Sequence, residues 1–227
     1  MACTPNIILI RWAVSAVGLA AASTLVVFGF IHFRDGLAND AAIPVPVSMV
    51  AHSKLPKAAY RAAADALANA NSRDGEAMIY RAEAELRAGA NTADVISLVR
   101  RGLTLAPASA RGWTLLSEAL MVSDKDGASR ALSQALILAP EDYFLIGAHL
   151  SEAAQLWGEL DQDTRRLALA QMRLMWQETK LREFFFDFAQ TRENQVLIRQ
   201  AFENEEIRDI NRWLMRESRQ RERANAR

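Results

Sequence analysis

The residue types that most often perform chemistry in proteins are scarce and scattered in this sequence. Its only cysteine is Cys3, and its three histidines are His32, His52 and His149. One cysteine excludes an intrachain disulfide and a cysteine-based zinc site. The histidines show no metal-ligand spacing, and His149 is expected to be exposed or half-buried on a helix. No HExxH, GxSxG, phosphate-loop or GxGxxG pattern is present. We therefore predict a protein that is not an enzyme and has no catalytic, cofactor-binding or metal-binding residues.

The acidic residues fit structural roles better than acid–base catalysis. Asp161 and Asp163 stand beside Thr164 at an expected helix start, where carboxylates cap the backbone and complement the helix dipole. A second acidic run is predicted to be a solvated helix face with nearby arginines; it comprises Glu203, Glu205, Glu206, Arg208 and Arg212. Because 27 Lys+Arg and 27 Asp+Glu cancel, the net charge gives no support for nucleic-acid binding.

An apolar segment near the N-terminus predicts a membrane anchor. Trp12 to Phe33 contains no charged residue and would span roughly 33 Å as a helix, about the thickness of a bilayer core. Arg11 and Arg34 flank it at the two expected interfaces. A buried core helix and a cleaved signal peptide are the alternatives to this uncleaved signal-anchor. We expect a single-pass protein of the bacterial inner membrane, with a cytoplasmic N-terminus and a periplasmic C-terminal domain.

The rest of the chain predicts an all-α fold. Residues 35–56 form a linker after the tail and anchor (1–34), because Pro44, Pro46 and Pro56 disfavour helix. Alanine, leucine, glutamate and arginine then dominate helix-sized intervals between clusters of breakers such as GANT, APAS and SDKDG. This pattern is typical of a helical bundle or an α-solenoid, which we divide into a repeat domain (57–179) and a C-terminal helical region with a basic tail (180–227).

An internal repeat favours the α-solenoid over the helical bundle. RRGLTLAP and SQALILAP end at Pro107 and Pro140, 33 residues apart. The segments before them follow a shared pattern of large and small residues: Ile79, Ala82, Glu83, Leu86, Val95, Val99 and Gly102, then Trp113, Leu116, Ser117, Leu120, Ala128, Leu132 and Ala135. This pattern resembles the tetratricopeptide repeat (TPR) family, and Glu83 departs from it where a small residue should pack. A third unit would begin near Glu141 and use Phe144. An irregular bundle remains the alternative.

The resemblance implies a TPR-like α-solenoid with a binding groove made by the first helix of each unit. Its partner-binding residues would be Tyr80, Arg87, Arg111, Thr114, Glu118 and Met121. Two arginines and a tyrosine could hold a peptide carboxylate or an acidic sugar. These residues could equally be ordinary exposed side chains.

Aromatic residues gather in the last part of the chain. The segment LREFFFDFAQ contains Phe184, Phe185, Phe186 and Phe188, too close together for one helical face. We expect them to fill the core that joins the C-terminal helices to the repeats; contact with a partner or a membrane surface is the alternative. The last twelve residues, from Arg216, are expected to be a frayed and solvated tail.

Taken together, these features predict a membrane-anchored scaffold or adaptor of the bacterial cell envelope that binds another envelope membrane protein. A weaker resemblance of Leu156–Trp176 to helical tails of membrane-anchored proteins from bacterial polysaccharide loci implies support of exopolysaccharide or O-antigen assembly. The alternatives are a structural subunit of a larger membrane complex and an enzyme whose site is not visible in the sequence.

Overall fold

The computed structural model describes residues 55–68 and 74–225 and is all-α over these ranges. Ten α-helices follow one another there: α3 (Lys57–Ala68), α4 (Gly75–Ala88), α5 (Thr92–Leu105), α6 (Ala110–Leu120), α7 (Lys125–Leu138), α8 (Ile146–Gln155), α9 (Gln162–Gln177), α10 (Arg182–Ala189), α11 (Asn194–Ala201) and α12 (Asn204–Asn225). A short 3-10 helix, η1 (Thr179–Leu181), precedes α10. The predicted anchor at Trp12–Phe33 lies outside these residues, and within them no helix is both long and apolar enough to cross a membrane.

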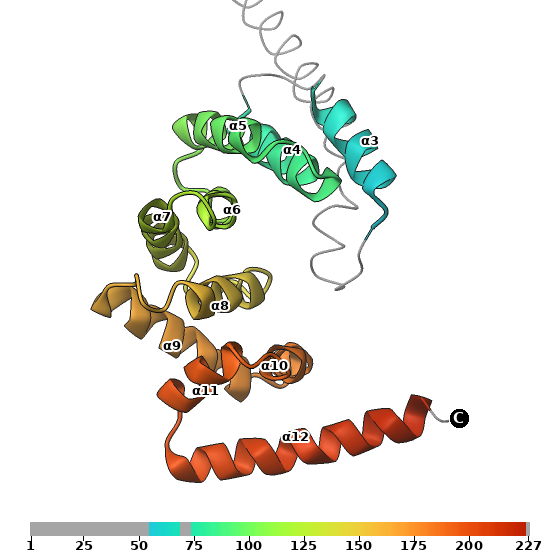
Figure 1. Cartoon of the computed structure of the whole chain (residues 1–227), viewed down its shortest axis with the longest axis vertical. Coiled ribbons are helices and arrows are strands. Elements are labelled where there is room, and N and C mark those ends of the chain that lie inside the picture. The colour runs from blue at the N-terminus through green and yellow to red at the C-terminus, as the bar shows by residue number, and fades with distance from the viewer. Residues whose placement is uncertain (1–54, 69–73, 226–227) are drawn as a thin grey trace, which may run out of the picture.

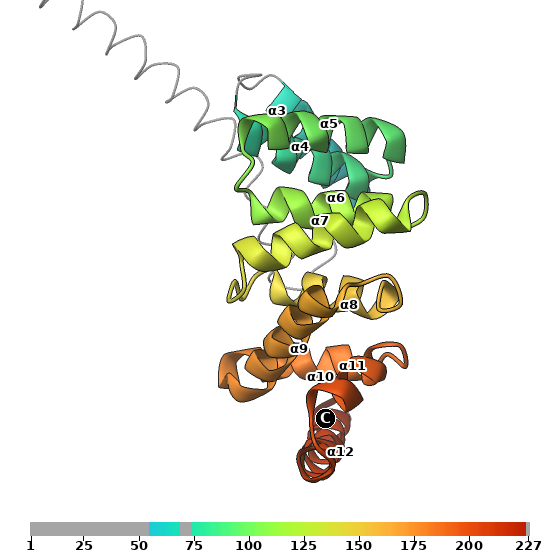
Figure 2. The ribbon, with the colours of Figure 1, turned by 90° about the vertical axis from the view of Figure 1, so that its left-hand side faces the viewer.

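The helices form layers along the long axis of the molecule (Figures 1 and 2). Consecutive helices pack together in the first half, above all α3 with α4, α4 with α5 and α6 with α7. A second set of contacts joins α4, α6 and α8, the first helices of successive pairs. These three helices therefore lie next to one another along one side of the stack.

Local capping chemistry explains where these helices begin and end. The side chains of Asp74, Ser109 and Asp124 accept backbone hydrogen bonds at the first turns of α4, α6 and α7. Gly89 ends α4 with φ of 86°, a left-handed conformation that glycine adopts without a steric penalty. Asp161 caps α9 by accepting from the Thr164 backbone N–H at 2.7 Å, which confirms its predicted structural role.

Small residues at the helix contacts allow the close packing that the repeat pattern predicts. Ala128 and Ala135 on α7 are fully buried, as is Ser117 on α6. A β-carbon added to Gly102 on α5 would lie only 2.8 Å from Cγ1 of Ile79 on α4. The prediction for the third unit is wrong at one position: Phe144 precedes α8 and is 62% exposed, while Leu150 of α8 is buried in the core.

The phenylalanine-rich segment forms the core of the C-terminal half, as predicted. Phe185, Phe186 and Phe188 are buried. The ring centroid of Phe185 lies 5.1 Å from that of Trp176 and 6.2 Å from that of Trp213. These aromatic contacts connect α9, α10 and α12.

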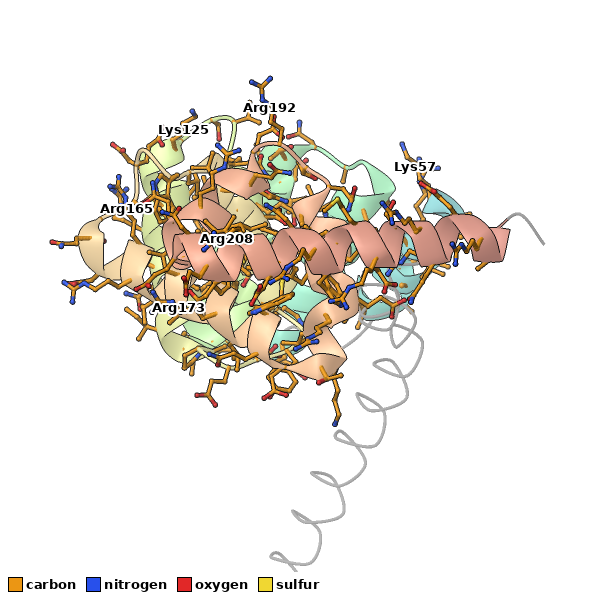
Figure 3. All side chains as sticks on the ribbon, turned by 90° about the horizontal axis from the view of Figure 1, so that it is seen from below. Lys57, Lys125, Arg165, Arg173, Arg192 and Arg208 are labelled. Atoms are coloured by element: carbon orange, nitrogen blue, oxygen red, sulfur yellow. The ribbon has the colours of Figure 1, made fainter. Side chains whose placement is uncertain are left out.

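The expectation of a frayed tail from Arg216 is wrong, because α12 continues to Asn225. This helix lies across the C-terminal end of the stack (Figures 1 and 3), and Figure 3 shows Arg208 near its beginning. Arg221 holds its far end: the guanidinium lies 4.2 Å from the Phe186 ring centroid, and Nη1 is 3.1 Å from Asp187 Oδ1. These contacts come from α10, and Asp187 lies 34 residues before Arg221 in the chain, so local sequence does not reveal them.

Candidate functional site: the inner face of α4, α6 and α8

Buried polar side chains line the inner face formed by α4, α6 and α8. Polar groups removed from water are costly unless they are hydrogen-bonded, so a concentration of them inside a helical stack requires an explanation. Three groups of residues make up this face: an ion pair and aromatic contact between α4 and α6, a second ion pair between the same helices, and a hydrogen-bonded chain from α6 through α8 to α9.

Arg111 of α6 bridges two residues of α4. Its Nη1 donates to Glu83 Oε2 at 3.1 Å, and its guanidinium carbon lies 5.3 Å from the Tyr80 ring centroid. Glu83 is only 1% exposed. Burial raises the pKa of Glu83 above its ordinary value, against the opposing effect of the nearby Arg111 and Arg87 charges. The residue that departs from the repeat pattern is therefore a buried partner of a predicted groove arginine.

Arg87 of α4 forms the second ion pair with Glu118 of α6. Its Nη2 donates to Glu118 Oε2 at 2.7 Å, and Nη1 donates to Oε1 of the same carboxylate. Burial alone would lower the pKa of Arg87, but the hydrogen bonds and charge of Glu118 raise it above its usual range. Both predicted groove arginines thus have a carboxylate partner within the chain, and an anionic ligand would have to compete with these partners.

Thr114 begins a chain of hydrogen bonds that ends on α9. Its Oγ1 lies 2.9 Å from Nε2 of His149, and Nδ1 of His149 lies 3.2 Å from Oε1 of Gln171. Nε2 of Gln171 donates to the carbonyls of Ala139 and Pro140, so its Oε1 is left as an acceptor. This arrangement places the ring proton of His149 on Nδ1, where Gln171 accepts it, and leaves Nε2 facing the Thr114 hydroxyl, which also lies 2.9 Å from the carbonyl oxygen of Ala110.

His149 is 0% exposed, so the expectation of an exposed or half-buried histidine is wrong. Burial lowers its pKa to about 4, although the hydrogen bond that His149 donates to Gln171 and the charge of Asp142 oppose this shift. The ring is therefore neutral at pH 7. Thr114 is also buried and faces His149, so the two residues act as an internal link between α6 and α8.

Glu152 of α8 is the carboxyl that has no arginine partner on this face. It is 5% exposed, and its Oε2 has no hydrogen-bond partner among the described residues. Burial raises its pKa well above the ordinary value; the Ser117 hydroxyl lowers it, the Glu118 charge raises it, and Arg87 lowers it. Glu152 lines a pocket of about 420 Å³ whose other lining residues are Arg87, Glu118, Met121, Ala148, Ser151 and Gln155.

Five of the six residues predicted for the groove stay close to this open surface. Arg87, Glu118 and Met121 line the pocket, and Tyr80 contacts Arg111 on the neighbouring part of the face. The sequence analysis missed three polar members, Glu83, His149 and Glu152. A spacing close to the repeat length was the available signal, since Glu83, Glu118 and Glu152 follow one another at 35 and 34 residues.

The chemistry available at this face is recognition by charge and hydrogen bonding. Over residues 55–68 and 74–225, no group of three or more histidine, cysteine or acidic side chains is placed to hold a metal ion. Comparisons of the chain with protein-family models, with curated proteins and with solved structures found no match.

Proposed function

We propose that the chain is a membrane-anchored, TPR-like scaffold or adaptor of the bacterial cell envelope that binds a protein partner on the inner face of α4, α6 and α8. The observation that carries the proposal is the pocket lined by the buried carboxyl of Glu152 and by side chains of three consecutive layers. A polar pocket that spans several rigid helices is suited to fix the side chains of a bound polypeptide.

The stacking of the helices supports a repeat architecture. The proline-ended octapeptides recur at 33 residues, and the helix pairs α4–α5 and α6–α7 that precede the two prolines pack tightly within each pair. Stacked helical pairs expose an extended face, which is the surface such proteins use for binding. The TPR-like solenoid is accordingly part of the proposal.

The proposed location depends on the apolar segment Trp12–Phe33. With this segment in the inner membrane and the N-terminus in the cytoplasm, the helical body would lie in the periplasm beside a membrane partner. Service to exopolysaccharide or O-antigen assembly depends on the weaker resemblance at Leu156–Trp176. The alternative of a structural subunit required the aromatic C-terminal half as a docking surface, but Phe185, Trp176 and Trp213 pack against one another within the chain.

Site-specific photocrosslinking in the native host would test this function. A photoreactive amino acid at Met121, which lines the pocket, should give a specific crosslinked product in the membrane fraction. Placed at Gln134, on the exposed part of α7 outside this pocket, it should not give the same product. A cytoplasmic location of the C-terminus, shown by reporter fusions after Arg227, would contradict the topology. Equal or absent crosslinking at both positions would contradict the proposed binding face.

A further inference from the structure

The inner face contains one more carboxyl group than it has arginines. Arg111 pairs with Glu83, and Arg87 pairs with Glu118. Among the described residues, Glu152 has no arginine partner of its own. Its Oε2 is buried there without a hydrogen bond of normal geometry, and the nearby Ser117 hydroxyl is the side chain that most favours its charged form. Removing a carboxyl group from water without a partner costs free energy, and a cation supplied by another molecule would remove that cost.

The pocket around Glu152 has walls that suit a long cationic side chain. Met121 and Ala148 provide apolar surface for a methylene stem. Glu118, Ser151 and Gln155 line the same pocket and carry oxygen atoms that can accept hydrogen bonds from a charged end group. Its volume of about 420 Å³ is ample for a single side chain.

We propose that this pocket binds a lysine or arginine side chain of the partner protein, with the Glu152 carboxylate as its counter-ion. The inference rests on the proposed function, since it specifies which chemistry the scaffold recognises on its inner face. A bound cation would complete a row of three ion pairs across α4, α6 and α8. Charge-assisted hydrogen bonds of this kind are about twice as strong as neutral ones.

An anionic ligand fits the pocket less well. A carboxylate or an acidic sugar would have to displace Glu118 from Arg87 and would lie close to Glu152. In the empty pocket, burial raises the pKa of Glu152 well above its ordinary value, because removal from water disfavours the charged form. A bound cation would favour that charged form, whereas a bound anion would disfavour it further.

Binding to selected peptides would test the inference. The full-length chain in detergent micelles would select binders from a library of random twelve-residue peptides, and affinities would be measured by fluorescence polarisation. We expect the binders to share a lysine or arginine. Replacing it with norleucine or citrulline should weaken binding to the wild-type chain about tenfold or more. The same replacement should change binding to Glu152→Gln less than about twofold, because the counter-ion is already absent.

Two further variants control for indirect effects. Glu141→Gln removes an exposed carboxylate in the α7–α8 loop and should behave as the wild-type chain. Gln155→Lys places an ammonium group one turn after Glu152 in the same pocket, so it should compete with the peptide and weaken binding about tenfold. Gln134→Lys, an equally exposed substitution on α7, should have no effect.

The outcomes separate the inference from the function on which it rests. If peptides bind but neutral replacement costs the same in the wild-type chain and in Glu152→Gln, the counter-ion role of Glu152 is overturned while the scaffold function stands. Binders without any shared cation would also overturn it. If the chain selects no peptide at all, the proposed binding function is overturned, and the inference is overturned with it.

Discussion

Replacing Gly102 with alanine should destabilise the protein, although the same change stabilises an ordinary helix. Gly102 lies within α5, and a β-carbon there would be 2.8 Å from Cγ1 of Ile79 and 3.0 Å from the backbone oxygen of Gly75. The first contact is shorter than the usual separation of non-bonded carbon atoms, roughly 3.5–4.0 Å. The second is tighter than most contacts that real β-carbons make. Ile79 is fully buried and branched at its own β-carbon, so its side chain has little freedom to move away.

The magnitude follows from two opposing effects. Overpacking a close-packed core costs about 1–3 kcal/mol. Alanine gains about 1 kcal/mol over glycine in helix propensity. Their difference predicts that Gly102→Ala lowers the free energy of unfolding by about 1 kcal/mol, within a range of about 0–2 kcal/mol.

Gly147 provides a matched control in another helix. It lies in α8, and an added β-carbon would meet no atom within 4 Å. Gly147→Ala should therefore raise the free energy of unfolding by about 0.5–1 kcal/mol. Urea denaturation of the full chain in detergent, followed by circular dichroism, measures both changes. If Gly102→Ala stabilises the protein as much as Gly147→Ala does, the proposed close approach of α4 and α5 is refuted.

Two further predictions concern His149 and the end of α12. His149 has a pKa lowered from 6.5 to about 4 in the folded chain, so its contribution to stability is complete above pH 6.5 and is lost as the pH falls toward 4. Over that window the free energy of unfolding of the wild-type chain, relative to that of His149→Gln, should fall by about 3 kcal/mol. The raised pKa values of Glu83 and Glu152 affect both chains equally, so their effects cancel in this comparison. If urea denaturation shows the same difference between the two chains at every pH, the neutral buried ring is contradicted. Arg221→Ala should lower hydrogen-exchange protection in the last turns of α12 by about 1 kcal/mol, because the contacts with Phe186 and Asp187 are lost. Arg223→Ala alters an exposed arginine and is the control. If both variants lose the same protection, the Arg221 contacts do not hold the helix.

The sequence predicted the helices well because their limits depend on local chemistry. A cap needs only a side chain and the backbone within three or four residues of it, as Ser109 shows with the Gly112 backbone N–H at 3.2 Å. Breaker clusters such as APAS and SDKDG therefore mark helix boundaries directly. The burial of the phenylalanine segment was predictable for a similar reason, since four such side chains within five positions cannot all face water.

The details of the inner face depend on residues far apart in the chain. Glu83 is acceptable inside the stack because Arg111, 28 residues later, reaches it. The burial of His149 depends on Gln171 of α9, and the order of the last turns of α12 depends on contacts with α10. A single sequence has no signal for which of many arginines meets which carboxylate. The repeat spacing reduces the number of possible pairs of arginine and carboxylate but does not identify the pairs that form.

Glu83 and Glu152 are both buried carboxyls on this face, but only Glu83 has an arginine partner among the described residues, so the two residues need different explanations. A buried ion pair is often no more stabilising than apolar residues of the same volume, so it is best understood as fixing the register of the elements it joins. Glu83 fits that role, because Arg111 connects it across α4 and α6. Glu152 does not, since none of the ion pairs among the described residues includes it, and only the neighbouring Ser117 hydroxyl and the charge of Arg87 favour its charged form. Glutamine at position 152 would keep a side-chain oxygen beside Ser117 and would break no ion pair among the described residues. Binding of a partner's cation therefore accounts for a carboxyl at this position better than a role in holding the stack together.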